Sequence, residues 1–120
     1  MELRLITEPE LTVAIVFGAI DDAARDTFNR HLHPLAARRN GRILIDLKEA
    51  TRITSNGLGA LVSLVAWANA HGTQVVLAAP TPHVHSVICV TRLDRFLEIS
   101  PTEEDARQRL LTANPEPPTA

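Results

Sequence analysis

The chain has 120 residues, of which 45% are apolar and 22% charged, and these proportions predict one globular domain with a substantial core. Twelve basic residues nearly balance fourteen acidic ones, and Phe and Trp are scarce, which argues against binding to nucleic acid or to an anionic membrane. A single cysteine excludes an internal disulfide and a cysteine-based zinc site. Because no long apolar run is present, we expect neither a signal peptide nor a membrane span, and a cytoplasmic protein.

The chain opens with two short apolar segments that predict an antiparallel pair of strands. Residues 3–6 and 11–17 are rich in Leu, Ile and Val, and β-branched side chains favour strands. Pro9 lies between the two segments, and its fixed φ angle is typical of a turn. Gly18 is expected to end the second strand.

A helix is predicted next, capped by Asp21 or Asp22 and running to about Arg39. Its apolar side chains recur at helical spacing. Pro34 lies inside this pattern and predicts a kink or an early end. Asn40 and Gly41 form a stop signal, with the glycine suited to the left-handed conformation that follows a helix.

The remaining segments alternate between strand and helix patterns. Residues 42–47 form a nearly continuous apolar run, which predicts a parallel strand buried on both faces, and residues 48–53 are expected to form a loop. The later elements expected are a helix ending at His71, a strand at 74–78, a helix at 83–91, an edge strand at 96–99 and a helix at 106–111 behind a capping box that starts at Thr102.

This order of elements predicts an α/β domain over residues 1–112. The sheet is expected to be mixed, with four or five mostly parallel strands, and about four helices should pack on it. Residues 113–120 form a Pro-rich tail that we expect to be disordered.

A run of hydroxyl and amide side chains joins the buried strand at 42–47 to the following helix. Thr54, Ser55 and Asn56 are good capping residues, because they can accept hydrogen bonds from the unpaired N–H groups of a first helical turn. The same helix end carries partial positive charge, which would favour a phosphate group. By this chemistry alone, Ser55 as a simple helix cap is the plainer interpretation.

The helix after this run has no charged residue from Asn56 to His71. Leu58, Leu61, Val62, Val65 and Ala68 form its predicted core stripe, and Trp67 falls roughly opposite, in line with Ala60 and Ser63. An uncharged face with a Trp suggests a partner-docking surface, since Trp is enriched among interface anchors. The alternative is that Trp67 lies under a neighbouring helix or the tail. The next predicted helix also places uncharged side chains off its core stripe, namely His85, Ser86 and Cys89.

Several residues resemble parts of catalytic or metal sites without completing one. His31 with His33, and His83 with His85, are two residues apart and do not share a helix face, so solvated histidines are the better interpretation. Asp46 lies at the end of a strand, as in a magnesium site, but no matching acidic pair follows the first strand, and capping explains Asp21 and Asp22 after the second. The chain lacks a G-x-S-x-G nucleophile motif. We therefore predict no catalytic residue, no metal site and no cofactor.

Taken together, the motifs resemble the STAS domain family, typified by bacterial anti-sigma factor antagonists. The resemblance covers about residues 3–111. Its central part is the segment from Ile45 to Leu61, with Thr54-Ser55-Asn56-Gly57-Leu58-Gly59 at the position of the family's aspartate-serine-serine-glycine-leucine-glycine loop. Further matching segments are residues 18–21, 72–77, 93–96 and 102–106.

The resemblance implies a non-enzymatic protein that binds an anti-sigma factor, itself a serine kinase, and thereby releases a sigma factor. In that family the kinase phosphorylates the first loop serine, which abolishes binding, and a PP2C-type phosphatase can restore it. By position this serine is Ser55. Thr54 stands in place of the family's aspartate and is a second candidate acceptor, while Asn56 replaces the second serine.

The predicted partner-binding surface combines the loop with the uncharged helix face. Its residues are Asp21, Thr54, Ser55, Asn56, Gly57, Gly59, Ala60, Ser63 and Trp67. Two alternatives stay open: a STAS regulatory or scaffold subunit of a transporter or signalling complex that is not switched, and a small enzyme or nucleotide-hydrolysing domain, which would lack the usual phosphate-binding glycine loop. The oligomeric state is also open, with a homodimer among the options.

Overall fold

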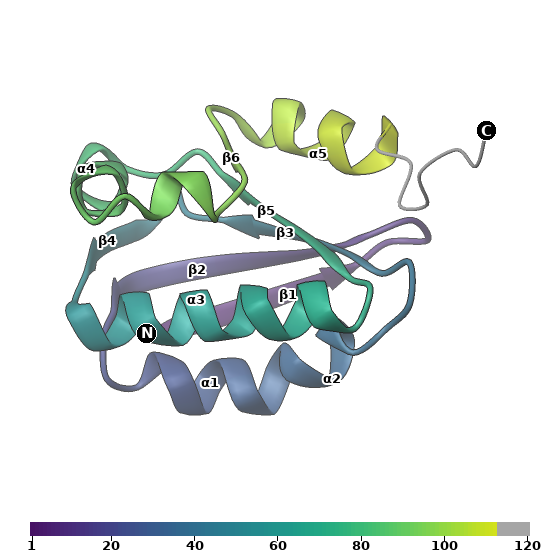
Figure 1. Ribbon diagram of the computed structural model, residues 1–120, viewed down its shortest axis with the longest axis horizontal. Helices are drawn as coiled ribbons and strands as arrows, with labels where there is room; N and C mark the ends of the chain where they lie inside the picture. The colour runs from purple at the N-terminus through teal and green to yellow at the C-terminus, as the bar shows by residue number, and fades with distance from the viewer. Residues whose placement is uncertain (113–120) are drawn as a thin grey trace.

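A mixed sheet runs through the middle of the molecule and separates two layers of helices (Figure 1). The computed structural model describes residues 1–112. Its elements are β1 (Glu2–Thr7), β2 (Thr12–Ile20), α1 (Ala24–His31), α2 (His33–Ala36), β3 (Arg42–Asp46), β4 (Ala50–Ile53), α3 (Ser55–Ala70), β5 (Gln74–Ala78), α4 (Pro82–Val90), the 3-10 helix η1 (Leu93–Arg95), β6 (Ile99–Ser100) and α5 (Glu103–Thr112).

The strand order is β1-β2-β3-β5-β6, and β4 also pairs with β2. β1 runs antiparallel to β2, and the other pairings are parallel. This confirms the predicted α/β fold with a mostly parallel sheet. The described sheet has six strands, because β4 formed in a segment expected to be a loop.

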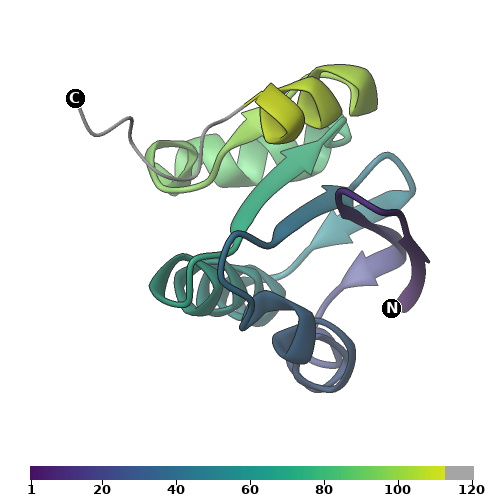
Figure 2. The same cartoon turned by 90° about the vertical axis from the view of Figure 1, so that its right-hand side faces the viewer.

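The two faces of the sheet are buried by different helices (Figure 2). In β3, Ile43 and Ile45 belong to the main core with Phe28 of α1, whereas Leu44 belongs to a second core with Leu110 of α5. Alternate side chains of a strand point to opposite faces, so both faces of β3 are covered. The predicted burial of this strand on both faces is confirmed.

Strand β2 continues past the residue that was expected to end it. Gly18 has a positive φ of 85°, and the pairing with β4 shifts register between Gly18 and Ala19. Beyond this irregularity β2 runs on to Ile20 and pairs with β4. The predictions of a strand end at Gly18 and of a loop at 48–53 were therefore wrong. The reason is that β4 is defined by pairing with the end of β2, which no local pattern of its own indicates.

The predicted helix at 21–39 is two helices and ends earlier. α1 stops at His31 and α2 carries Pro34 in its first turn, so the break expected from Pro34 is confirmed. The predicted stop at Asn40 and Gly41 was wrong, since α2 ends at Ala36. Asn40, not Gly41, has the positive φ, of 61°. Gly41 is close-packed instead: a Cβ there would lie 2.8 Å from Oγ1 of Thr73.

The later elements follow the sequence pattern closely. β5 has the predicted bounds, and α4 begins one residue before the expected position. β6 is shorter and later than predicted, because Leu97 turns into the main core after η1 and pairing with β5 begins only at Ile99. The predicted cap of the last helix is confirmed, since Oγ1 of Thr102 accepts a hydrogen bond from the N–H of Asp105 at 3.0 Å. The predicted tail lies outside the described residues. Within residues 1–112, no helix has the length and apolar character that crossing a membrane requires.

Candidate functional site at the start of helix α3

The start of α3 is held against the end of β2 by Thr54. Its backbone N–H donates to the carbonyl oxygen of Ile20 at 3.0 Å, and its Oγ1 accepts from the N–H of Gly57 at 3.1 Å. Thr54 is therefore the N-cap of the helix. This corrects the simpler interpretation of Ser55 as the cap: three adjacent side chains could all cap, and the pairing of Ile53 with Ile20 decides which one is in place.

Gly57 marks the closest approach between α3 and the end of β2. A Cβ on this residue would lie 1.9 Å from the carbonyl oxygen of Ile20, which is far inside contact distance. The residue is buried. Gly57 is thus needed where helix meets strand, and it presents nothing to a partner.

Ser55 is the first residue of α3 and is exposed. In the described part of the chain no group forms a hydrogen bond with its hydroxyl, because Thr54 supplies the cap. The first turn of α3 contains no acidic side chain. The Ser55 hydroxyl is therefore accessible at a helix end that favours negative charge.

The first turns of α1 and α3 lie at the same end of the molecule, at the left in Figure 1. Nδ2 of Asn56 donates to Oδ1 of Asp22 at 2.8 Å and joins the two segments. Oδ1 of Asp21 accepts from the N–H of Ala23 at 3.1 Å, within the turn before α1. Ala23 itself is the N-cap and has no side-chain cap, so the predicted capping of α1 by Asp21 or Asp22 was wrong by one or two residues.

The outward face of α3 is narrower than predicted. Ala60, expected beside Trp67 on that face, is only 3% exposed and lies in the main core with Ala24 and Phe28 of α1. Ser63 is exposed, Gly59 and Val62 are half-buried. Of the predicted core stripe, four residues are buried and Val62 is partly covered, while Leu64 joins the core as well.

The α3 face is also not free of charge, because α1 contributes to it. A Cβ placed on Gly59 would lie 3.8 Å from Nη2 of Arg25, so this guanidinium reaches across from α1 to α3. Asp22 adds a carboxylate beside Asn56. The charges that the α3 sequence lacks are thus supplied by the neighbouring helix.

Trp67 lies at the seam between α3 and α2 and is 39% exposed. Its ring stacks on His33 at a centroid distance of 5.0 Å and on His71 at 4.1 Å. Nδ1 of His71 lies 2.8 Å from the carbonyl oxygen of Trp67, to which it can donate. Trp67 is therefore partly covered by histidines and partly open. His33 is not a simple solvated histidine, contrary to our expectation.

Asp46 is fully buried at the end of β3. Its Oδ1 accepts from the backbone N–H of Lys48 at 3.0 Å, and its Oδ2 faces Nζ of Lys48 at 3.4 Å. This arrangement holds the turn into β4 and leaves the carboxylate inaccessible. Among the described residues, His, Cys, Asp and Glu side chains form no group of three that could hold a metal ion.

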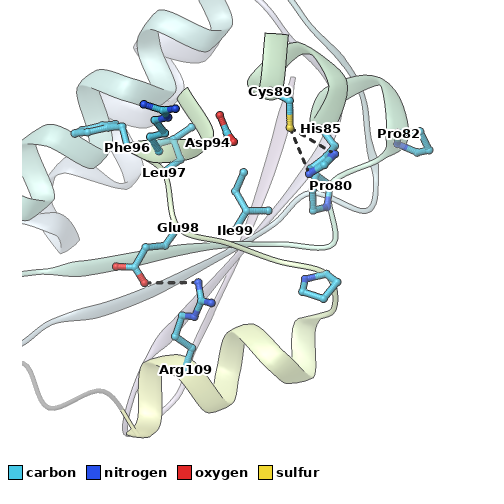
Figure 3. Close-up of a pocket in the computed structure, with 12 residues that line it drawn as sticks. Pro80, Pro82, His85, Cys89, Asp94, Phe96, Leu97, Glu98, Ile99 and Arg109 are labelled. Carbon is cyan, nitrogen blue, oxygen red and sulfur yellow. Dashed lines mark hydrogen bonds and ion pairs between the residues drawn. The ribbon is translucent and has the colours of Figure 1, made fainter. Parts of the chain in front are cut away.

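A hollow of about 940 Å³ lies at the β6 edge of the sheet, between α4 and η1 on the face that α1 and α3 cover and α5 on the other face (Figure 3). The exposed His85 and Cys89, predicted to lie off the core stripe of α4, line it. Asp94 and Glu98 balance Arg95 and Arg109 around it, and Arg109 lies 3.9 Å from Glu98. This balance indicates no particular class of ligand. Sequence patterns could not reveal the hollow, because four separate elements form it.

Comparison with known proteins agrees with this fold. The family model for the STAS domain matches residues 3–106, and the chain belongs to the STAS domain family. Among its relatives is a STAS-domain containing protein of Pseudomonas aeruginosa, which is 31% identical over 91 residues that cover 76% of this chain and 88% of that protein.

Solved structures with the same fold include two described as anti-sigma factor antagonists. A candidate antagonist from Thermotoga maritima has a TM-score of 0.80 at 20% identity, covering 91% of this chain and 94% of that one. Unphosphorylated SpoIIAA of Bacillus has a TM-score of 0.72 at 19% identity, covering 94% of this chain and 99% of that one. At these identities the likeness shows the shared fold.

Proposed function

We propose that this chain is an anti-sigma factor antagonist, a non-catalytic cytoplasmic binding module that docks a serine-kinase anti-sigma factor and is switched off by phosphorylation of Ser55. The observation that carries the proposal is that two adjacent hydroxyl groups at the start of α3 have different roles. Thr54 caps the helix, and the neighbouring Ser55 hydroxyl is exposed and unbonded among the described residues. A kinase could therefore modify Ser55 without breaking the cap.

The same geometry favours Ser55 over Thr54 as the acceptor. Oγ1 of Thr54 accepts from the N–H of Gly57 and lies 3.5 Å from the carbonyl oxygen of Ile20. Phosphorylation of Thr54 would break these contacts, and loss of a threonine cap costs about 1 kcal/mol. The predicted second acceptor is thus the less favourable one.

The switch would act at the bound surface. A phosphate adds a charge of about −1.5 to −2 and considerable bulk. At the start of α3 this charge is compatible with the helix dipole, so the fold should persist. An interface closed over the Ser55 hydroxyl would have to accommodate the bulk and negative charge of the phosphate, which disfavours binding.

The proposed partner surface is smaller than the one predicted from the sequence. The surface keeps the residues on the outward face of α3, namely Asn56, Gly59, Ser63 and Trp67. Asp21 and Thr54 stay at its edge. Gly57 and Ala60 are buried and are removed. The fold neighbour SpoIIAA has been solved in an unphosphorylated and a phosphorylated form, with TM-scores of 0.72 and 0.64 to this chain, and this supports a phosphorylation switch.

A second candidate function is a STAS regulatory or scaffold subunit that is not phosphorylated. Thr54 favours it, since this residue stands where the family loop has an aspartate. Asn56 also favours it, because the residue in place of the second serine is bonded to Asp22. A phosphorylation assay separates the two functions.

The assay incubates the chain with ATP and, in turn, each serine-kinase anti-sigma factor purified from the same organism. Mass spectrometry of the loop peptide should find one phosphate on Ser55. Ser55→Ala should remove it, whereas Ser63→Ala, an exposed serine on the same helix, should not. If no kinase modifies the loop, the switch is wrong and the scaffold function is favoured.

A further inference from the structure

Arg25 reaches from α1 over the face of α3 that carries Ser55. Its Nη2 lies 3.8 Å from the position of a Cβ on Gly59. Gly59 is four residues after Ser55, and side chains four residues apart on a helix lie on one face with about 5–6 Å between their Cβ positions. Because the Cα–Cβ bond of a helical residue tilts toward the N-terminus, the Gly59 position points toward Ser55. Together the two distances place Nη2 of Arg25 within about 10 Å of the Cβ of Ser55.

The Arg25 guanidinium is available for a new ion pair. The side chain is exposed, and it has no ion pair or hydrogen bond with any residue from 1 to 112. Arg30 on the same helix differs, because its Nε is 3.5 Å from Oδ2 of Asp26. Asp22, three residues before Arg25, accepts instead from Asn56.

We propose that Arg25 is the side chain that binds the phosphate on phosphorylated Ser55. This proposal rests on the proposed phosphorylation of Ser55. A guanidinium pairs well with a phosphate dianion, since its planar N–H groups can donate two parallel hydrogen bonds. In the unmodified chain Arg25 is free to meet an acidic group of a partner, and in the phosphorylated chain the phosphate takes it. Phosphorylation of Ser55 would thus make the same arginine unavailable to the partner.

The other charges near Ser55 define the alternatives. Asp21 and Asp22 lie at the start of α1 and repel a phosphate, which makes a compensating cation more important. Arg52 of β4 is the competing cation, since it is exposed and three residues before Ser55. It pairs in the sheet with Ala19, on the strand side of the loop. The Nη2 of Arg25, in contrast, lies over the face of α3, 3.8 Å from the position of a Cβ on Gly59.

The test uses chains made with phosphoserine at position 55 during synthesis, so that no kinase is needed. Phosphorus NMR measures the second pKa of the phosphate, ordinarily about 6. An adjacent guanidinium favours the dianion and lowers that pKa. Arg25→Gln should therefore raise it by roughly half a unit relative to the parent chain, and less in 1 M salt. Arg52→Gln and Arg30→Gln should leave it unchanged.

The outcomes separate this proposal from the proposed function. An unchanged pKa in Arg25→Gln, or a rise in Arg52→Gln instead, would overturn the role of Arg25 without affecting the kinase assay. Partial retention of the low pKa in Arg25→Lys, which keeps the charge and loses the planar fork, would support it. Failure of every kinase to modify Ser55 would contradict the proposed function even if the installed phosphate pairs with Arg25.

Discussion

Single residues at the start of α3 hold the site in place, and Gly57 is the most constrained of them. Its α-carbon approaches the Ile20 carbonyl so closely that a Cβ would lie 1.9 Å from the oxygen. Gly59, two residues later, has space: the nearest atom outside the helix backbone, Nη2 of Arg25, would lie 3.8 Å from a Cβ. These two glycines of one loop motif therefore have different structural roles.

This difference predicts opposite effects of alanine. Gly57→Ala must displace α3 from the end of β2 and should lower the free energy of unfolding by about 1–3 kcal/mol or more. Gly59→Ala is the matched control and should raise it by about 0.5–1 kcal/mol, since alanine is the better helix former. Urea denaturation measures both. Equal stability of Gly57→Ala and the parent chain would show that the close approach is not required.

The sequence predicted which segment forms the candidate site but not which of its polar side chains caps α3. Thr54, Ser55 and Asn56 are all good capping residues, so local propensity could not choose among them. The choice is made by β4, which brings Thr54 to the Ile20 carbonyl. Arg25 escaped prediction because it belongs to another helix, and its position near Gly59 depends on how α1 and α3 pack.

At the scale of elements, an ion pair between Glu8 and Arg107 joins the first hairpin to the last helix. Both oxygens of Glu8 accept hydrogen bonds from Arg107, at 2.5 and 3.1 Å, and join the β1–β2 turn to α5. These hydrogen bonds hold the pKa of Glu8 below its ordinary value. The pair is partly open to solvent, so it orients α5 more than it stabilises the fold.

The lowered pKa predicts an acid-dependent contribution to stability. Because the folded state holds Glu8 ionised more readily than the unfolded state, the contribution is present above about pH 4.3, the pKa of an unfolded glutamate. It is lost as the pH falls through the lower folded pKa. Glu8→Gln should therefore be less stable than the parent chain at pH 7, and urea denaturation should show this deficit shrinking as the pH falls below about 4.3.

The control for this prediction is Glu10→Gln, in the same turn. Glu10 is exposed and forms no ion pair with any residue in the described range. Its substitution should have little effect over this pH range. A Glu8→Gln deficit that does not shrink as the pH falls would mean that ionisation of Glu8 is not involved.

Elements with their own periodic pattern were predicted well, and elements defined by pairing were not. β3 and β5 are apolar runs bounded by turn residues, and both appear close to the predicted positions. β4 is a short strand in which only Ala50 and Ile53 are buried. The bulge at Gly18 that allows this pairing is likewise invisible in the sequence, where glycine indicates a strand end equally well.

At the scale of the whole molecule, helices cover both faces of the sheet, and the candidate site lies at one end of it. α1 and α3 bury one face and begin side by side at the end where β2 stops (Figure 1). The main core beneath Ser55 does not depend on its hydroxyl, which is exposed. Phosphorylation should therefore change the surface while the fold stays intact, with a change of only a few degrees in melting temperature.

The most direct test of the phosphorylation switch is the affinity of the chain for a serine-kinase anti-sigma factor of its own organism, measured by titration calorimetry. The unmodified chain is compared with the chain carrying phosphoserine at position 55, after thermal melts establish that both are folded. We predict a Kd at least about a hundredfold higher for the phosphorylated chain, a loss of about 2.7 kcal/mol, because the phosphate adds bulk and negative charge inside the interface. Equal Kd values for the two folded chains would contradict the proposed switch.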